Sequence, residues 1–171
     1  KQNKMAILKN EQLGDIGMFY KTYEPKTKNR FYFDIEGIPA YLVKKADRPK
    51  PSFEEITLDH INLQRKLKGR VSWGDITCEL YDPINPSGAQ AVMNWFRLHH
   101  ESVTGRDGYQ DFYKKDVKFR SLGPVGDVVE EWECKGTFIK SIDFSDTDWS
   151  NTNTAQTISM TLAMDYCLLR Y

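Results

Sequence analysis

The chain has 171 residues, of which 40% are hydrophobic and 13% aromatic, and this is enough to fill the core of one domain and too much for a disordered chain. Lys plus Arg and Asp plus Glu both number 24, so the formal net charge is zero. This balance argues against a surface devoted as a whole to nucleic acid or to an anionic membrane. We expect a single domain over residues 1–171.

The N-terminal segment, residues 1–28, is expected to be an extension of that domain, with a short helix around Met5 to Leu13. Charged residues interrupt it, so it fits neither a signal peptide nor a membrane span, and no later segment is long enough to cross a membrane. The three cysteines are odd in number and form no CxxC pair, which predicts buried free thiols and synthesis in the cytoplasm. They are Cys78, Cys134 and Cys167.

Alternating apolar and polar residues predict strands in the first half of the chain. The first strand, within residues 29–37, places Phe31, Phe33 and Ile35 on one face. Further strands are expected at 40–46, 53–60 and 61–70, the last two as polar ribbons joined near residues 60–62.

The run of residues 71–80 holds five apolar side chains whose parity changes at Gly74. We predict a β-bulge at Gly74, because one extra residue there would bring all five to the same face. The five are Val71, Trp73, Ile76, Cys78 and Leu80.

Two later runs predict the remaining strands. In residues 128–138 we expect Val128, Trp132, Cys134 and Phe138 to point inward and Glu131, Glu133 and Lys135 to point outward. In the closing strand, residues 157–166, the inward side chains are expected to be Ile158, Met160, Leu162, Met164 and Tyr166.

Residues 87–104 predict the one clear helix. Ser87 is a suitable N-cap, Gly105 ends the pattern, and apolar side chains recur near 3.6-residue spacing. The stripe consists of Val92, Phe96, His99 and Val103, with Ala89 and Met93 beside it. The fold class is therefore mainly β, a sandwich or barrel with one flanking helix.

No residue pattern in the sequence predicts an enzyme. His99 and His100 are adjacent, so on a helix they point about 100° apart rather than at one metal, and His60 has no ligand partner at useful spacing. Paired carboxylates such as Glu54 and Glu55 are sequence neighbours, which face opposite sides of a strand. We predict no catalytic residues, no metal site and no cofactor.

Basic residues gather in residues 44–70, where eight Lys and Arg stand against four acidic residues, a net charge of +4 that leaves −4 for the remainder. A basic two-stranded arm on an acidic body suits head-to-tail self-association. The alternative is an ordinary charged hairpin in solvent. The residues expected to contact a neighbouring subunit are Lys44, Lys45, Arg48, Arg65, Lys66, Lys68 and Arg70.

Short motifs from about Asn29 to Tyr166 resemble, in order and spacing, those of the tail tube proteins of contractile-tailed bacteriophages. The first strand "NRFYFDIEGI", the helix "AVMNWFRLHH", an Asp-Trp in a loop and a closing strand of the form "VTLALDY" carry the likeness. The matching positions include Arg65, Lys68, Gly69, Lys135, Gly136, Phe138, Asp148, Trp149 and residues 161–166. The N-terminal extension and the final "LLRY" depart from the pattern.

The resemblance implies a bent antiparallel β-sandwich or barrel that forms six-subunit rings, stacked into the inner tail tube of a contractile tail. Its implied partners are other copies of itself, the sheath, baseplate and tail terminator proteins, and DNA and the tape measure protein in the lumen. It implies assembly in the host cytoplasm and a place in the virion. A baseplate tube-initiator subunit, or the tube of a phage-like bacteriocin or injection system, is the alternative within this class. A monomeric β-barrel binding module is the alternative outside it.

If the chain lines such a tube, polar side chains on the outer faces of the strands are candidates for the lumen wall. Acidic groups outnumber basic ones there, and a negative wall would let DNA slide, because phosphate contacts with Lys and Arg dominate DNA affinity. The candidates are Asp75, Glu79, Glu131, Glu133, Lys135 and Asp165.

Overall fold

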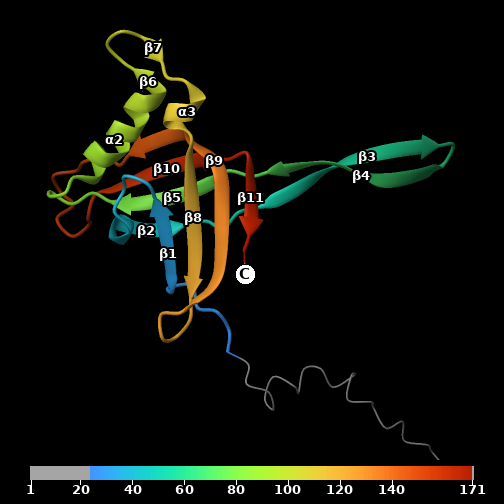
Figure 1. Ribbon diagram of the computed structural model, residues 1–171, viewed down its shortest axis with the longest axis horizontal. Coiled ribbons are helices and arrows are strands. Elements are labelled where there is room, and N and C mark those ends of the chain that lie inside the picture. The colour runs from blue at the N-terminus through green and yellow to red at the C-terminus, as the bar shows by residue number, and fades with distance from the viewer. Residues whose placement is uncertain (1–23, 171) are drawn as a thin grey trace, which may run out of the picture.

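The computed structural model describes residues 24–170, as a β-sandwich body from which one long hairpin projects (Figure 1). The short helix expected around Met5 to Leu13 and most of the predicted N-terminal extension lie outside the described residues.

Strands dominate the described chain. They are β1 (Phe31–Ile35), β2 (Val43–Ala46), β3 (Pro51–His60), β4 (Leu63–Trp73), β5 (Ile76–Tyr81), β6 (His100–Glu101), β7 (Arg106–Asp107), β8 (Lys115–Leu122), β9 (Val128–Phe144), β10 (Thr157–Ala163) and β11 (Tyr166–Leu169). The helices are the 3-10 turn η2 (Ala40–Leu42), α2 (Gly88–His99) and the single turn α3 (Gln110–Tyr113).

The main sheet has the order β1-β8-β9-β10-β5-β2, with β11 pairing to β9 and every pair antiparallel. The 17-residue strand β9 belongs to both halves of the sandwich. Its first part pairs with β8 and β11, and its residues 138–144 pair with β10. Figure 1 shows β9 bending between the two halves. The predicted fold class, a bent antiparallel β-sandwich with a flanking helix, is confirmed.

The bend in β9 lies at Gly136, whose φ of 63° is in the left-handed region that favours glycine. A Cβ added there would meet the carboxylate of Asp165. The bend changes which side chains point inward, because Thr137 and Ile139 are buried while Phe138 is only partly buried. The prediction that Phe138 points into the core was therefore wrong, and so was that for Val128, which is exposed.

The core lies between the two halves of the sheet. It contains Ile76, Cys78 and Leu80 of β5 as predicted, and Ile158, Met160 and Leu162 of β10 as predicted. The closing strand does not run on to Tyr166, however. It ends at Ala163, and after the break β11 buries Cys167 and exposes Tyr166.

Gly74 separates two strands instead of forming a bulge within one. β4 ends at Trp73, β5 begins at Ile76, and the Gly74 amide donates to the Lys50 carbonyl at 2.9 Å. Val71 is exposed because it belongs to the projecting hairpin and not to the body. The five side chains of this run therefore do not share one face.

Helix α2 begins where predicted, with the Gln90 amide donating to the Ser87 hydroxyl at 3.3 Å. It ends at His99 rather than at residue 104, and the following residues form the small hairpin of β6 and β7. Val103 is consequently exposed instead of packed. The buried stripe is formed by Val92 and by Trp95, which the sequence analysis missed.

Candidate assembly surfaces

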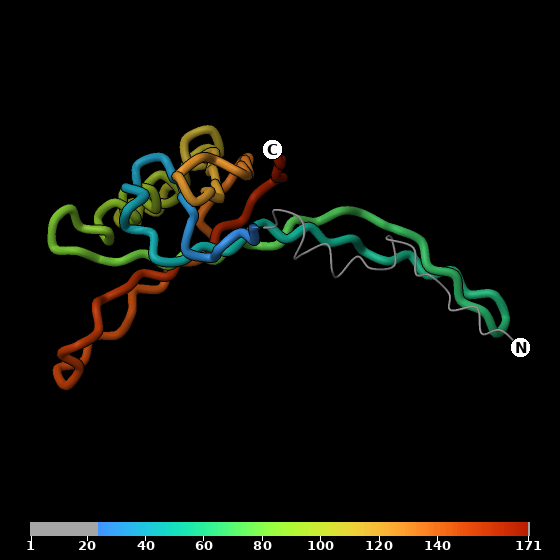
Figure 2. The backbone as a smooth tube through the Cα atoms, turned by 90° about the horizontal axis from the view of Figure 1, so that it is seen from below, coloured from blue at the N-terminus to red at the C-terminus, as the bar shows by residue number. Residues whose placement is uncertain are grey.

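The projecting hairpin of β3 and β4, which we call the arm (Pro51–Trp73), extends well beyond the body (Figure 2). Residues 61 and 62 connect its strands, and nearly all of its side chains are exposed. The predicted pair of ribbons is therefore present, but its strands make no ladder with any other strand of residues 24–170.

One face of the arm is apolar towards its tip. Directly opposed residues of an antiparallel pair point to the same side, and Ile56 opposes Leu67 while His60 opposes Leu63. Leu58, two residues from Ile56, shares that side. We call Ile56, Leu58, Leu63 and Leu67 the apolar arm face; Ile56 and Leu58 are each 50% exposed.

The other face of the arm is charged. Lys66 pairs with Glu55 at 2.7 Å, and the Lys68 ammonium lies 4.8 Å from the ring centroid of Phe53. Both contacts are formed within the arm, so its charges are partly neutralised there. Of the predicted contact residues, Arg65 opposes Leu58 and therefore lies on the same side as the apolar arm face, and Arg70 lies at the register shift of the hairpin.

Lys44, Lys45 and Arg48 precede the arm and belong to the body. Lys44 pairs with Glu79 at 2.6 Å, and Arg48 lies 3.3 Å from the carboxylate of Glu130. The arm itself holds four basic and three acidic residues, so its net charge is +1 and the prediction of a strongly basic arm was wrong. The excess positive charge lies at the edge of the body instead.

The candidate lumen residues do not form a bare acidic surface. Each carboxylate has a cationic partner: Asp75 with Lys140 (2.6 Å), Glu79 with Lys44 (2.6 Å), Glu131 with Arg120 (2.7 Å), Glu133 with Lys135 and Arg170 (2.6 and 2.7 Å), and Asp165 with Lys114 (2.8 Å). The argument for a negative wall was therefore wrong, because it counted charges strand by strand and missed the partners across the sheet.

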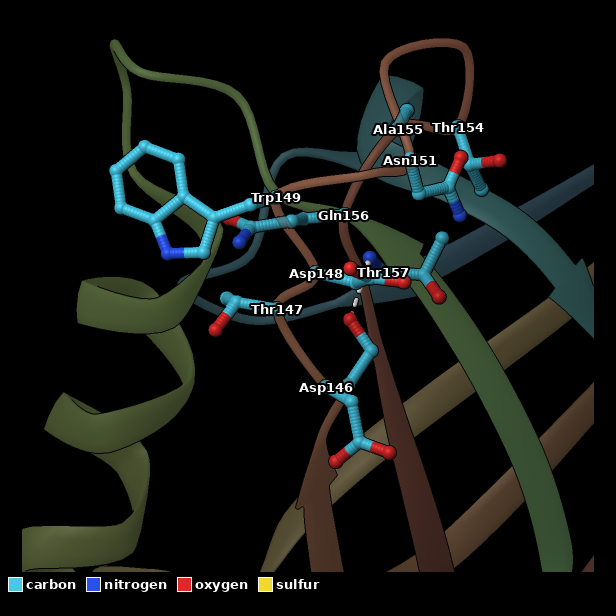
Figure 3. A pocket seen from close by; sticks show the side chains of 10 residues that line it. Asp146, Thr147, Asp148, Trp149, Asn151, Thr154, Ala155, Gln156 and Thr157 are labelled. Carbon is cyan, nitrogen blue, oxygen red and sulfur yellow. Dashed lines mark hydrogen bonds between the residues drawn. The ribbon is translucent and has the colours of Figure 1, made fainter.

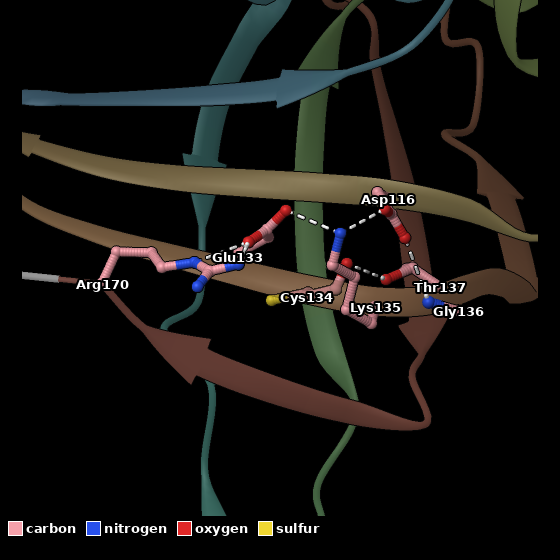
Figure 4. Close-up of polar contacts among 7 residues, drawn as sticks. All are labelled: Asp116, Glu133, Cys134, Lys135, Gly136, Thr137 and Arg170. Atoms are coloured by element: carbon pink, nitrogen blue, oxygen red, sulfur yellow. Dashed lines mark hydrogen bonds and ion pairs between the residues drawn. The ribbon is translucent and has the colours of Figure 1, made fainter.

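Glu133 is at the centre of the densest of these networks (Figure 4). Its carboxylate forms ion pairs with Lys135 and Arg170, and the Lys135 ammonium also pairs with the carboxylate of Asp116 at 2.6 Å. The hydrogen bonds from Lys135 and Arg170 lower the pKa of Glu133 to about 2. Arg170 follows β11, so this network ties the last strand to the sheet.

A cleft with many basic side chains lies at the edge between β1 and β2. The sequence analysis missed it, because its two walls come from separate segments, residues 26–31 and 44–48. We call it the basic cleft; its lining is Lys26, Thr27, Lys28, Arg30, Phe31, Lys44, Lys45, Ala46, Asp47, Arg48, Phe119 and Ser121.

One buried carboxylate lies beneath the basic cleft. Glu130 is 8% exposed and accepts hydrogen bonds from Lys26, Arg48 and the Trp132 indole. Burial by itself raises the pKa of Glu130, but the bonds from Lys26 and Trp132 and the charge of Arg48 outweigh it and lower the pKa. Glu130 therefore stays ionised and holds two of the cleft's cations.

The connection between β9 and β10 forms a second projection, which we call the Trp149 loop (residues 145–156). Trp149 is 102% exposed, and its ring points away from the other labelled side chains in Figure 3. Asp148 accepts from the Ser150 amide and hydroxyl at 2.9 and 2.8 Å, which lowers its pKa. No Lys or Arg occurs in residues 141–169.

His99 and the cysteines have packing roles. The His99 Nδ1 donates to the Trp95 carbonyl at 3.0 Å, and its Nε2 accepts from the Ile139 amide at 3.2 Å, which requires the neutral ring. All three cysteines are buried free thiols, as predicted. Within residues 24–170 no cluster of three or more His, Cys, Asp or Glu is placed to hold a metal ion, and no described helix is long and apolar enough to span a membrane.

Chains in solved structures of contractile injection systems share this fold. The chain superposes on the anti-feeding prophage tube-terminating cap with a TM-score of 0.71 and 18% identity, over 88% of this chain and 93% of that one. Against a chain of the sheath/tube terminator of an extracellular contractile injection system, the TM-score is 0.70 with 17% identity, over 88% and 100% of the chains.

A third solved structure has the same fold. It is a chain of the sheath-tube complex of that extracellular injection system in its extended state, with a TM-score of 0.68 and 17% identity over 92% of this chain and 96% of that one. No protein-family model matches the chain, and no curated protein matches its sequence. The likeness is therefore one of fold, over nearly the full length of the chains compared.

Proposed function

We propose that the chain is a structural subunit of the inner tube of a contractile tail or injection machine, and not an enzyme. The observation that carries the proposal is the shared fold with sheath-tube and tube-terminator chains over 88–92% of this chain. In this role six copies form a ring, and rings stack into a tube inside a sheath.

The arm supports this role, because it is a long element with an apolar face that the described part of its own chain leaves uncovered. A monomer gains little from such a face, whereas a neighbouring copy would bury it and stabilise the ring or the stack. The two predicted contact regions, the arm and Lys44, Lys45 and Arg48, would then meet different parts of a neighbour.

The wider partners follow from the same proposal. They are the sheath around the tube, the baseplate and terminator proteins at its ends, and the tape measure protein with DNA or another cargo in its lumen. Assembly takes place in the host cytoplasm, and the finished tube belongs to a virion or to a released injection particle. The ion-paired residues Asp75, Glu79, Glu131, Glu133, Lys135 and Asp165 remain candidates for the lumen wall, which would be polar with little net charge.

A second candidate function is a tube-terminating or tube-initiating subunit. It is favoured by the likeness to the anti-feeding prophage cap, because the TM-score and the identity to that cap are about the same as those to the sheath-tube chain. A terminator would form single rings that do not stack, whereas a tube subunit would polymerise.

Electron microscopy of the purified protein in negative stain tests both. Tubes of uniform width support the tube subunit, single rings support the terminator, and dispersed monomers at high protein concentration would refute both in favour of a monomeric binding module.

A further inference from the structure

The Trp149 loop has the properties of a protein-binding anchor without a partner. Trp149 is fully exposed, and tryptophan is the residue type that most often dominates the affinity of an interface. Asp146 and Asp148 are its neighbours in the loop and Asp143 lies at the end of β9, so residues 143–156 carry a charge of −3. Its partner should therefore be a basic surface that offers an aromatic or apolar contact.

The basic cleft has both properties. Six of its lining residues are Lys or Arg, and the rings of Phe31 and Phe119 stack at its base with centroids 6.0 Å apart. Counting Lys50 and the carboxylates that pair here (Glu24, Asp47, Glu79 and Glu130), seven cations stand against four anions, a net charge of +3.

Two of the cleft's cations are available for a partner. Within residues 24–170 Lys28 and Lys45 form no ion pair, while the other four contact carboxylates of their own chain. Arginine also stacks on indole rings, and Arg30 and Arg48 stand at the cleft, each paired with a carboxylate through one guanidinium nitrogen. The cleft can therefore receive both the carboxylates and the indole of the loop.

The loop does not fill the cleft of its own chain. The full exposure of Trp149 shows that its indole touches nothing there, and Figure 2 shows the loop projecting from the body on the side away from the arm. Contact between the two surfaces thus joins two copies through different patches. Such a heterologous contact generates a ring when the rotation between copies closes, and an open helix when it does not.

We propose that the Trp149 loop of one copy docks in the basic cleft of a second copy. The indole of Trp149 packs against Phe31 and the neighbouring guanidinium groups, and Asp146 and Asp148 face Lys28 and Lys45. This inference rests on the proposed function, since it names one of the contacts by which the subunits assemble.

The first test measures assembly of the full chain by sedimentation and light scattering over a range of protein concentrations. Trp149→Ala should raise the concentration needed for assembly by about 30-fold, the effect of losing an interface hot spot. Tyr109→Ala, which removes another exposed aromatic on a different surface, is the matched control and should assemble as the unmodified chain does. Equal assembly of both variants would overturn the proposal.

The second test uses charge. Asp146→Lys with Asp148→Lys should abolish assembly at physiological salt, and so should Lys28→Glu with Lys45→Glu, since each change opposes like charges. Combining all four in one chain makes the loop positive and the cleft negative, and should restore assembly. Failure of the combined variant to recover, with circular dichroism showing a folded chain, would overturn the docking.

The outcomes separate this proposal from the one on which it rests. If the unmodified chain never assembles, the proposed function fails first. If the chain assembles and all these variants assemble equally, only the docking is wrong. Binding of a short DNA duplex that is lost in Lys28→Glu with Lys45→Glu, without any change in assembly, would assign the cleft to an anionic ligand and overturn the docking.

Discussion

Replacing Ile56 and Leu58 by threonine should weaken self-assembly without unfolding the subunit. Both side chains lie on the apolar arm face, and each is 50% exposed. Threonine is β-branched, which suits a strand, so the hairpin should still form. The change removes apolar surface from the part of the arm that, in our proposal, a neighbouring copy covers.

The size of the effect follows from the exposed fraction. Full burial of a Leu or Ile side chain contributes about 1.5–3 kcal/mol, so covering the exposed half contributes about 1 kcal/mol for each residue. Losing two of these contributions, about 2 kcal/mol for each contact between copies, weakens that contact about 30-fold. The concentration at which the purified chain assembles, measured by sedimentation, should rise by at least this factor.

Lys66→Thr provides the matched control, because it makes the same new residue on the charged face of the arm. It removes only an exposed ion pair with Glu55, and such pairs contribute about 0–1 kcal/mol. Assembly should therefore change by less than about 5-fold. If Lys66→Thr impairs assembly and the double threonine variant does not, the arm acts through its charges and the reasoning from the apolar face is wrong.

Three further predictions concern the body of the subunit. Burial lowers the pKa of His99 below 6.5, so the unfolded chain binds the proton more readily than the folded chain does. The free energy of unfolding of the unmodified chain should therefore fall as the pH drops below about 6.5, and His99→Gln should not show this fall. The pKa of Glu133 is lowered from 4.5 to about 2, so its contribution to the free energy of unfolding is complete above about pH 4.5 and is lost as the pH falls towards 2. In Glu133→Gln the free energy of unfolding should therefore fall less steeply with pH over that range. Thr161→Pro, in a strand paired to Thr77 on one side and Ser141 on the other, removes a ladder donor and should cost about 1–3 kcal/mol; a normal melting temperature by circular dichroism would contradict the strand assignment.

The parts of the fold that the sequence predicts well are those where one face of a strand is buried along its whole length. Ile76 to Leu80 and Ile158 to Leu162 alternate strictly, because each lies in the middle of the sheet with the core on one side. The alternation fails as a guide at Gly136, since a single residue of positive φ shifts the parity of everything after it.

The surfaces were harder to predict because they depend on which strands are neighbours. Glu131 looks like a free charge in the sequence, yet register places it opposite Arg120, 11 residues away. The basic cleft is formed by two segments that lie apart in the sequence. The apolar arm face was not predicted, because apolar and polar residues alternate only weakly in β3 and β4. In both cases the pairing of the strands, and not the composition of a segment, decides what the surface offers.

The sharing of β9 between the two halves of the sandwich also sets an order of folding. Strands β8, β9 and β10 follow one another in the chain and pair as consecutive hairpins, whereas β10 joins β5 across more than 80 residues, as Thr161 pairs with Thr77. Short loops close faster and at lower entropic cost than long ones, so this three-strand meander forms early and β5 and β2 add to it late. The arm connects β2 to β5 and is held at its base by the Gly74 amide on the Lys50 carbonyl. Its direction relative to the body is thus fixed only when the last strands are in place, so a copy that presents the arm correctly has already completed its core.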